Sequence, residues 1–250
     1  MIKIALCFSG QPRDIDIIYP FIKQSMLDGN DVDIFAHTWW DPDNLSHNSV
    51  IPDRTHKTFS ADAIDRIKTL YQPKRMMVEK PKVWKRKYEV TEKQLDEGPG
   101  WARDVEGGLE VGKEYLCNMT NSMFYSIMMS NLLKEQYSVD NNIEYDLVVR
   151  CRFDFSPHAT INFNAITLKE DEILCHSTGL PYGMPHDWFA IGTTESMNAY
   201  SGVYHHINEI IKQSIREDGW WCNELHLKHH LRNNNIKIIH ANLLVFGHKG

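Results

Sequence analysis

The sequence predicts an α/β fold built on a mostly parallel sheet, and three observations lead to that prediction. The chain opens with an apolar run at 2–8 that ends in the turn-forming cluster 9–13. Apolar residues with helical spacing follow at 15–26, and a second apolar run occupies 32–36. A third run, 145–151, has the continuous apolar stretch of a strand buried on both faces. Strand, helix and strand in this order are typical of a parallel sheet covered by helices.

The remaining elements follow from the same patterns. Residues 37–60 are polar and contain prolines, so we expect a long loop there. The longest helical pattern spans 113–137, where apolar residues recur on one face. The other expected elements are helices at 61–70, 194–215 and 223–231 and strands at 73–79, 173–175, 187–192 and 236–240.

Length and pattern predict one domain over residues 1–250. A chain of 250 residues fits a single large domain. Residues 81–112 are charged, rich in glycine and without clear periodicity. Because long stretches of this kind in compact domains are often functional, we interpret 81–112 as a mobile insertion or lid.

Composition excludes several classes of protein. With 42% hydrophobic and 24% charged residues the chain is not disordered, and its net charge of -6 argues against a nucleic-acid partner. No apolar run approaches the roughly 20 residues of a transmembrane helix, and no signal peptide is visible. Five cysteines form no CxxC pair, which favours a reducing, cytoplasmic location.

The first candidate site is the loop after the first strand, formed by Ser9, Gly10, Gln11 and Arg13. In open α/β sheets ligands bind beyond the carboxyl ends of the strands, and the start of the next helix favours anions. Gly10 allows close approach of the backbone, and Arg13 can bind phosphate through two hydrogen bonds. The alternative is a plain turn with a surface arginine.

The second candidate site lies at the end of the strand at 145–151, where Arg150, Arg152 and Asp154 alternate. Alternation predicts that all three side chains share one face. A carboxylate there can hold a divalent cation, and an arginine can neutralise a leaving diphosphate. The alternative is an internal Arg–Asp ion pair that closes the end of the strand.

Two further carboxylates are candidates for acid–base chemistry. Asp187 begins an aromatic stretch with Trp188, and it either accepts the proton of an acceptor hydroxyl or caps or pairs within the fold. Glu224 lies near the start of a helix, so it either caps that helix or faces the site.

Several histidines near the C-terminus have the residue type of metal ligands. His226 and His230 have the four-residue spacing of a zinc pair, and His229 lies between them. A solvated helix face explains these three more simply. His240 and His248, at or beyond the last strand, are either metal ligands or interior polar groups.

Five segments together resemble a known family. They are IALCFSGQPR at 4–13, DIFAHTW at 33–39, YDLVVRCRFD at 145–154, DWFAIG at 187–192 and ELHLKHHL at 224–231. Their order resembles that of microbial and viral glycosyltransferase-like proteins related to WavE-like lipopolysaccharide-synthesis enzymes. The resemblance covers most of the chain outside 81–112.

The resemblance implies a GT-A fold and transfer of a sugar from a nucleotide-sugar donor to a glycan, lipid-linked or protein-linked hydroxyl, as in polysaccharide biosynthesis. It implies a nucleotide-binding role for Ser9, Gly10, Gln11, Arg13, Arg150 and Arg152 and a catalytic base at Asp187 or Glu224. In that fold a DxD motif holds Mn²⁺ or Mg²⁺. Here Arg152 replaces the first aspartate, so either Asp154 binds the metal with a histidine or Arg152 supplies the positive charge.

We consider three other functions on the basis of the sequence. The replaced aspartate favours a nucleotide-sugar-binding protein of the same fold that lacks turnover. A nucleotidyltransferase is disfavoured because its basic glycine-rich loop is not seen. A pure scaffold is disfavoured because it has no need of charged residues at strand ends.

Overall fold

The computed structural model describes residues 2–45, 59–96, 105, 107–157, 159–176, 183–241 and 245–247. Most of the predicted loop 37–60 and part of the predicted insertion 81–112 lie outside these residues. So do much of the loop before Asp187 and the candidate ligand His248.

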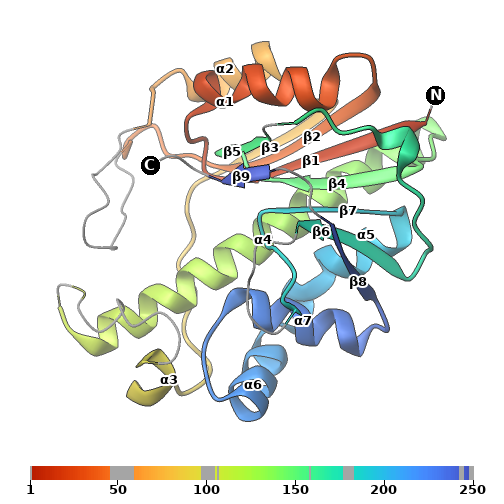
Figure 1. Cartoon of the computed structure of the whole chain (residues 1–250). Helices are drawn as coiled ribbons and strands as arrows, with labels where there is room; N and C mark the ends of the chain where they lie inside the picture. The colour runs from red at the N-terminus through yellow and green to blue at the C-terminus, as the bar shows by residue number, and fades with distance from the viewer. Residues whose placement is uncertain are drawn as a thin grey trace.

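A seven-stranded sheet forms the centre of the molecule, with strand order β3-β2-β1-β4-β7-β6-β8 (Figure 1). Only β7 runs against its neighbours β4 and β6, so the predicted α/β class with a mostly parallel sheet is confirmed. The strands are β1 (Lys3–Gly10), β2 (Asp31–Trp39), β3 (Arg75–Glu79), β4 (Leu147–Cys151), β6 (Glu172–His176), β7 (Phe189–Gly192) and β8 (Lys237–Ala241). A second, two-stranded sheet pairs β5 (Phe155–Pro157) with β9 (Val245–Gly247).

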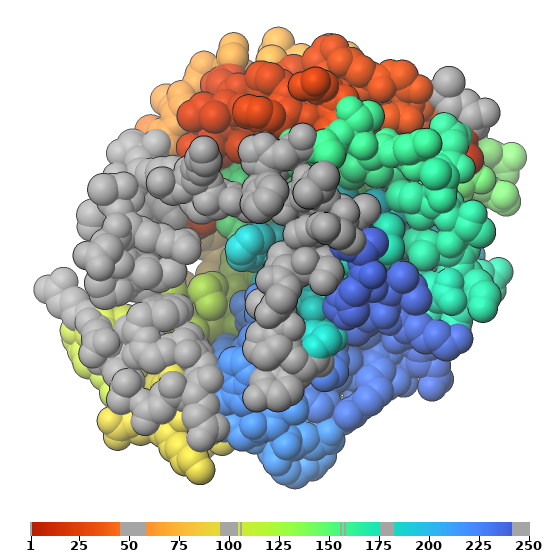
Figure 2. Space-filling view, viewed as in Figure 1, coloured from red at the N-terminus to blue at the C-terminus, as the bar shows by residue number. Residues whose placement is uncertain are grey.

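Helices cover both faces of the large sheet. One layer contains α1 (Ile15–Ile22), which continues as a π-helical turn, and α2 (Ala63–Leu70). The other layer contains α4 (Leu109–Asn141), α5 (Thr194–Ser201), α6 (Ile207–Asp218) and α7 (Asn223–Asn233). These layers lie at opposite sides of the molecule in Figures 1 and 2. Within the described part of the chain, no helix is long and apolar enough to cross a membrane.

The first strand shows why the continuous apolar pattern forms a central strand. Ala5 and Cys7 pack into the core on the α4 side, whereas Ile4, Leu6 and Phe8 pack on the α1 side. Successive side chains of a strand point to opposite faces, so a strand covered on both faces needs apolar residues at every position.

Several boundaries differ from the sequence prediction. The predicted helix 194–215 is divided by a 3₁₀ turn at Gly202–His206, which begins at a weak helix former. The long helix begins at Leu109, inside the predicted insertion, and ends at Asn141. The second strand continues to Trp39, three residues past the predicted end, because β3 pairs with it over that stretch.

Residues 81–96 pack against α4. The backbone N–H of Trp84 donates to Asn118 of α4 at 2.6 Å, and Arg86 forms ion pairs with Glu110 and Glu114 of α4. The short helix α3 (Glu92–Asp96) follows. This part of the predicted insertion is therefore attached to the domain, and a lid at 81–112 stays a prediction.

Candidate functional site

Three chain segments meet at one edge of the large sheet. The parallel strands β1 and β4 end there, at Gly10 and Cys151. The antiparallel strand β7 begins there, because Phe189 pairs with Cys151. The loops after β1 and β4 and the segment before β7 therefore carry their side chains to the same place.

Arg13, Arg152 and Asp154 form a tight ionic cluster at this edge. The Nε and Nη2 atoms of Arg152 donate to the two carboxylate oxygens of Asp154 at 2.7 and 2.5 Å. Arg13 Nη1 lies 3.5 Å from Asp154 Oδ2. The internal Arg–Asp ion pair considered from the sequence is thus present, and Arg13 from another loop joins it.

The alternation predicted for Arg150, Arg152 and Asp154 is wrong beyond Cys151. The strand ends at Cys151, and the chain turns, with Phe155 N–H donating to Arg152 O at 3.3 Å. Residues two apart in a strand are separated by about 6.6 Å. The turn brings the Asp154 carboxylate into contact with the Arg152 guanidinium. A continued strand would keep the two residues apart.

Arg150 is a buried cation separate from that cluster. Its side chain lies within β4, and the residue is 2% exposed. The guanidinium donates to the carbonyl of Cys151, its Nε has no hydrogen-bond partner among the described residues, and it forms no ion pair with a described carboxylate. Burial lowers the pKa of Arg150, although the nearby charge of Asp187 opposes that shift. A buried charge with so few partners is costly for folding.

Asp187 is a buried carboxylate that also lacks a full set of partners. It is 4% exposed, and its Oδ1 atom has no hydrogen-bond partner among the described residues. Burial, assisted by the negative charge of Glu224, raises the pKa of Asp187 to about 7, while Arg152 and Arg150 partly oppose this shift. Asp187 therefore exchanges a proton near neutral pH. It neither caps a helix nor forms an ion pair with a described residue.

Glu224 lies in the first turn of α7 and acts on Asp187 electrostatically. Its side chain does not cap the helix, whose N-cap residue is Cys222. Instead Glu224 Oε2 accepts a hydrogen bond from Cys222 Sγ at 3.0 Å. The two candidate bases thus belong to one acidic pair, in which Asp187 is the more buried member.

The loop after β1 is fixed at Gly10. Gly10 has a φ of 117°, a conformation that favours glycine, and a Cβ there would meet no atom within 4 Å. Ser9 is buried, and its hydroxyl has no hydrogen-bond partner within the described part of the chain. Gln11 accepts a hydrogen bond from Arg13. Arg13 is therefore part of the site and not a plain surface arginine.

Space for a ligand adjoins this loop. A cavity of about 340 Å³ lies between the starts of α1 and α2, and Arg13 lines it together with apolar side chains such as Ile17 and charged ones such as Asp16 and Arg66. The ring centroid of Trp188 lies 5.3 Å from the Arg152 guanidinium carbon. Trp188 thus packs on the ionic cluster.

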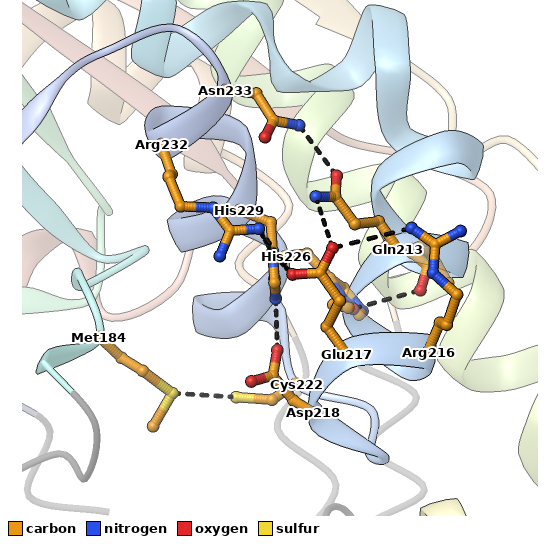
Figure 3. Close-up of polar contacts among 12 residues, drawn as sticks. Met184, Gln213, Arg216, Glu217, Asp218, Cys222, His226, His229, Arg232 and Asn233 are labelled. Atoms are coloured by element: carbon orange, nitrogen blue, oxygen red, sulfur yellow. Dashed lines mark hydrogen bonds and ion pairs between the residues drawn. The ribbon is translucent and has the colours of Figure 1, made fainter.

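The solvated histidine face expected on α7 is wrong. His226, His229 and His230 are 0%, 3% and 3% exposed, because α7 packs against α5 and α6. His229 bonds to Asp218 at the end of α6 and to Arg232, as Figure 3 shows. His226 Nδ1 contacts Ser214 Oγ at 2.5 Å, and His230 Nε2 contacts the Ala199 carbonyl at 2.9 Å.

The residues present do not fit a divalent cation. Both oxygens of Asp154 are already hydrogen-bonded by guanidinium groups, which compete with a metal for the same lone pairs. Among the described residues, no three His, Cys, Asp or Glu side chains are grouped as ligands, and this includes His240. The positive charge at this edge therefore comes from arginines.

Three residues near the site were not singled out from the sequence. Thr38 and His37 lie at the end of β2, inside the stretch interpreted as strand exit and loop, and Ser126 lies on α4. Their hydrogen bonds converge on Gly10 and its neighbours. The sequence offered little signal for Ser126, because other buried polar residues such as Ser130 also lie on α4.

Comparison with known proteins adds little to this description. No protein-family model and no curated protein matches the sequence. Among solved structures, the chain is similar to the apo-form glycosyltransferase GlyE of Streptococcus pneumoniae TIGR4, with a TM-score of 0.42 and 8% identity. The match covers 96% of this chain but only 45% of that chain, so this chain spans less than half of its length. The site itself therefore has to support any functional conclusion.

Proposed function

We propose that the protein transfers a sugar from a nucleotide-sugar donor to a hydroxyl group of an acceptor. The observation that supports this most is a pair of incompletely partnered buried charges, Arg150 and Asp187, at the carboxyl edge of the sheet. Buried groups of this kind concentrate at functional sites because folding alone disfavours them. Two more arginines, Arg13 and Arg152, lie at the same edge.

The three arginines suit a diphosphate leaving group. Guanidinium groups bind phosphate oxygens through paired hydrogen bonds and keep their charge at all physiological pH values. Asp154 orients Arg152 and Arg13, and Trp188 supports the guanidinium of Arg152. Fixed positive charge aimed at a departing diphosphate lowers the barrier without reorganisation during the reaction.

Asp187 acts as the general base in this proposal. The acceptor oxygen bonds to the anomeric carbon, the bond from that carbon to the diphosphate breaks, and the diphosphate leaves with the electron pair. The proton of the acceptor hydroxyl passes to Asp187. A base with a pKa near the working pH combines a populated ionised form with useful basicity, and burial, assisted by the charge of Glu224, raises the pKa of Asp187 into that range.

Arginines replace the divalent cation in this proposal. Since both oxygens of Asp154 are engaged by guanidinium groups, the diphosphate charge is neutralised by Arg13, Arg150 and Arg152. Turnover is therefore expected to persist in EDTA within about twofold, because an arginine needs no exchangeable cofactor.

The test is a panel of UDP, GDP and CDP sugars in which release of the free nucleoside diphosphate is followed with and without EDTA. We expect release from at least one donor, slowed strongly in an Asp187→Asn variant. A matched control is Asp33→Asn, because Asp33 is equally buried but far from this edge. No release from any donor, in the presence or absence of Mn²⁺, would contradict the proposal.

A second candidate is a nucleotide-sugar-binding protein without turnover. The engagement of Asp154 by two arginines favours it, because the carboxylate is then unavailable as a reacting group. This candidate predicts that donor nucleotides raise the melting temperature while no nucleoside diphosphate is released. Release that depends on Asp187 excludes it.

A further inference from the structure

Both backbone polar groups of Gly10, its N–H and its carbonyl, are hydrogen-bonded to side chains. Gly10 is the residue at which the loop that carries Arg13 leaves β1. Its N–H donates to Ser126 Oγ of α4 at 2.9 Å, and its carbonyl accepts from Thr38 Oγ1 of β2 at 2.9 Å. The residue lies at a φ of 117°, so the direction of the following loop depends on this one torsion. Three elements of the fold therefore meet at the turning point of the loop.

The hydrogen bond from Gly10 continues into the interior through a buried chain. Ser126 Oγ lies 2.7 Å from His37 Nδ1, and His37 Nε2 lies 2.9 Å from Glu79 Oε2. Ser126 and His37 are both 0% exposed. The chain thus runs from Gly10 at the site to Glu79 at the end of β3, without a water-exposed link between them.

The charge state of Glu79 decides which atom donates the proton in each hydrogen bond of this chain. Burial alone would raise the pKa of Glu79, but hydrogen bonds from three neighbours, led by Lys82, outweigh it and lower the pKa to about 2. Glu79 is therefore an ionised acceptor, so His37 Nε2 must carry the proton. Burial also lowers the pKa of His37, which leaves Nδ1 as a lone pair that accepts from Ser126.

The opposite tautomer is disfavoured by the same geometry. A proton on Nδ1 of neutral His37 would set the Nε2 lone pair against an ionised Glu79 oxygen at 2.9 Å. Ser126 would then have to donate to the His37 carbonyl at 3.4 Å, a longer contact than 2.7 Å. With the Nε2–H tautomer, Ser126 donates to His37 and accepts from Gly10, so each group has its partner.

We propose that Ser126 and His37 are positioning residues, which fix the Gly10 peptide and thereby aim the Ser9–Arg13 loop at the diphosphate of the ligand. This inference rests on the proposed function, because it assigns a task to a loop taken to bind that diphosphate. The Gly10 N–H is committed to Ser126 and does not contact the ligand. By fixing the Gly10 peptide, Ser126 and His37 also fix the position of Arg13, which the turn at Gly10 directs to Asp154.

We call the hydrogen bond from Gly10 N–H to Ser126 Oγ the anchor of the loop. Loss of this anchor should weaken diphosphate binding more than it affects the fold. A loop without its anchor must be ordered on binding, and that ordering costs conformational entropy. We therefore expect roughly a tenfold weaker affinity, which corresponds to about 1.4 kcal/mol.

The test compares two serines of α4 in the full-length chain. Ser126→Ala removes the anchor, whereas Ser130→Ala removes an equally buried hydroxyl that donates to the Ile127 carbonyl of its own helix at 2.9 Å. Affinity for inorganic pyrophosphate is measured by calorimetry. We expect about tenfold weaker binding for Ser126→Ala and a change within about twofold for Ser130→Ala. Equal affinities of the two variants overturn the inference.

A second measurement is independent of any ligand and remains useful if Ser126→Ala does not fold. The ¹⁵N resonances of histidine-labelled wild-type protein report the tautomer, and those of His37 are identified by their loss in His37→Gln. We expect the neutral Nε2–H form, whereas an Nδ1–H or doubly protonated His37 overturns the chain of donors described above. Absence of pyrophosphate binding by the wild type, with the expected tautomer present, removes the proposed function and the positioning role together.

Discussion

Two buried aspartates at opposite ends of the sheet show how differently the fold treats the same side chain. Asp33 and Asp187 are both 4% exposed. Near the amino ends of β1 and β2, Asp33 accepts a hydrogen bond from Tyr145 at 2.9 Å and pairs with two lysines at 3.1 and 3.5 Å. Asp187, at the carboxyl edge, has no ion pair with a described residue, and one of its oxygens has no hydrogen-bond partner there.

The number of partners distinguishes a buried charge that stabilises the fold from one that is available for a function. A buried carboxylate with several donors recovers much of its lost hydration, so Asp33 fits a structural role. Asp187 and Arg150 do not recover it, which fits the roles in ligand binding and reaction proposed for them. His229 and His230 of α7 resemble Asp33 in this respect, because each has a protein partner.

The largest effect is expected on turnover. Asp187→Asn should lower the rate constant of sugar transfer by about 10²–10⁴-fold, the usual contribution of a positioned base. Asp33→Asn should leave that rate constant within about twofold, because Asp33 has no contact with the site. Steady-state kinetics on both variants measures the difference. Similar losses in the two variants would remove the distinction between the two ends of the sheet.

A smaller loss of turnover is expected from Arg150→Met. Removing a fixed positive charge from the leaving-group site should cost about 10²-fold in rate. Because the buried guanidinium has few partners, the free energy of unfolding should stay constant or rise. Lys134→Met is the matched control, since Lys134 is equally buried but pairs with Glu135 and Asn198. The control should lose stability and keep its rate.

The third effect concerns stability at the amino end of the sheet. Asp33→Asn should lower the free energy of unfolding by about 1–3 kcal/mol, because Tyr145, Lys3 and Lys74 lose their charged acceptor. Urea denaturation followed by circular dichroism measures it. An Asp33→Asn variant as stable as the wild type would mean that these partners contribute nothing and that partnering does not distinguish the two aspartates.

The smallest effect is a pH dependence of stability. The pKa of Asp187 is raised by folding to about 7, so the folded state binds a proton that the unfolded chain releases. Stability from this group is therefore complete at low pH and is lost as the pH rises from about 4 to 7. Asp187→Asn should escape that loss and melt higher than the wild type by about 5 °C at pH 8, with a much smaller difference at pH 4.5. If the two proteins differ in melting temperature by the same amount at both pH values, the raised pKa of Asp187 is wrong.

Sequence patterns predicted most elements of the fold because periodicity reports local geometry. The continuous apolar runs at 2–8 and 145–151 led to central strands, and both lie in the middle of the sheet. The patterns did not predict the burial of His226, His229 and His230, because polar residues on a helix look solvated until its neighbours are known. They also missed the turn after Cys151, which is decided by pairing across the sheet.

For the site, the sequence alone determined which residue types lie near the strand ends: arginines and an aspartate at the end of the strand at 145–151, an arginine after the first strand, and an acid at the start of the strand at 187–192. Only the tertiary structure decided which of them meet. It brings Arg13 to Asp154 across 141 positions of the chain, leaves Arg150 and Asp187 without full partners, and links Gly10 to Ser126. The physical reason is that strand order and direction set these distances, and hydrogen-bond partners distant in sequence leave no trace in local periodicity.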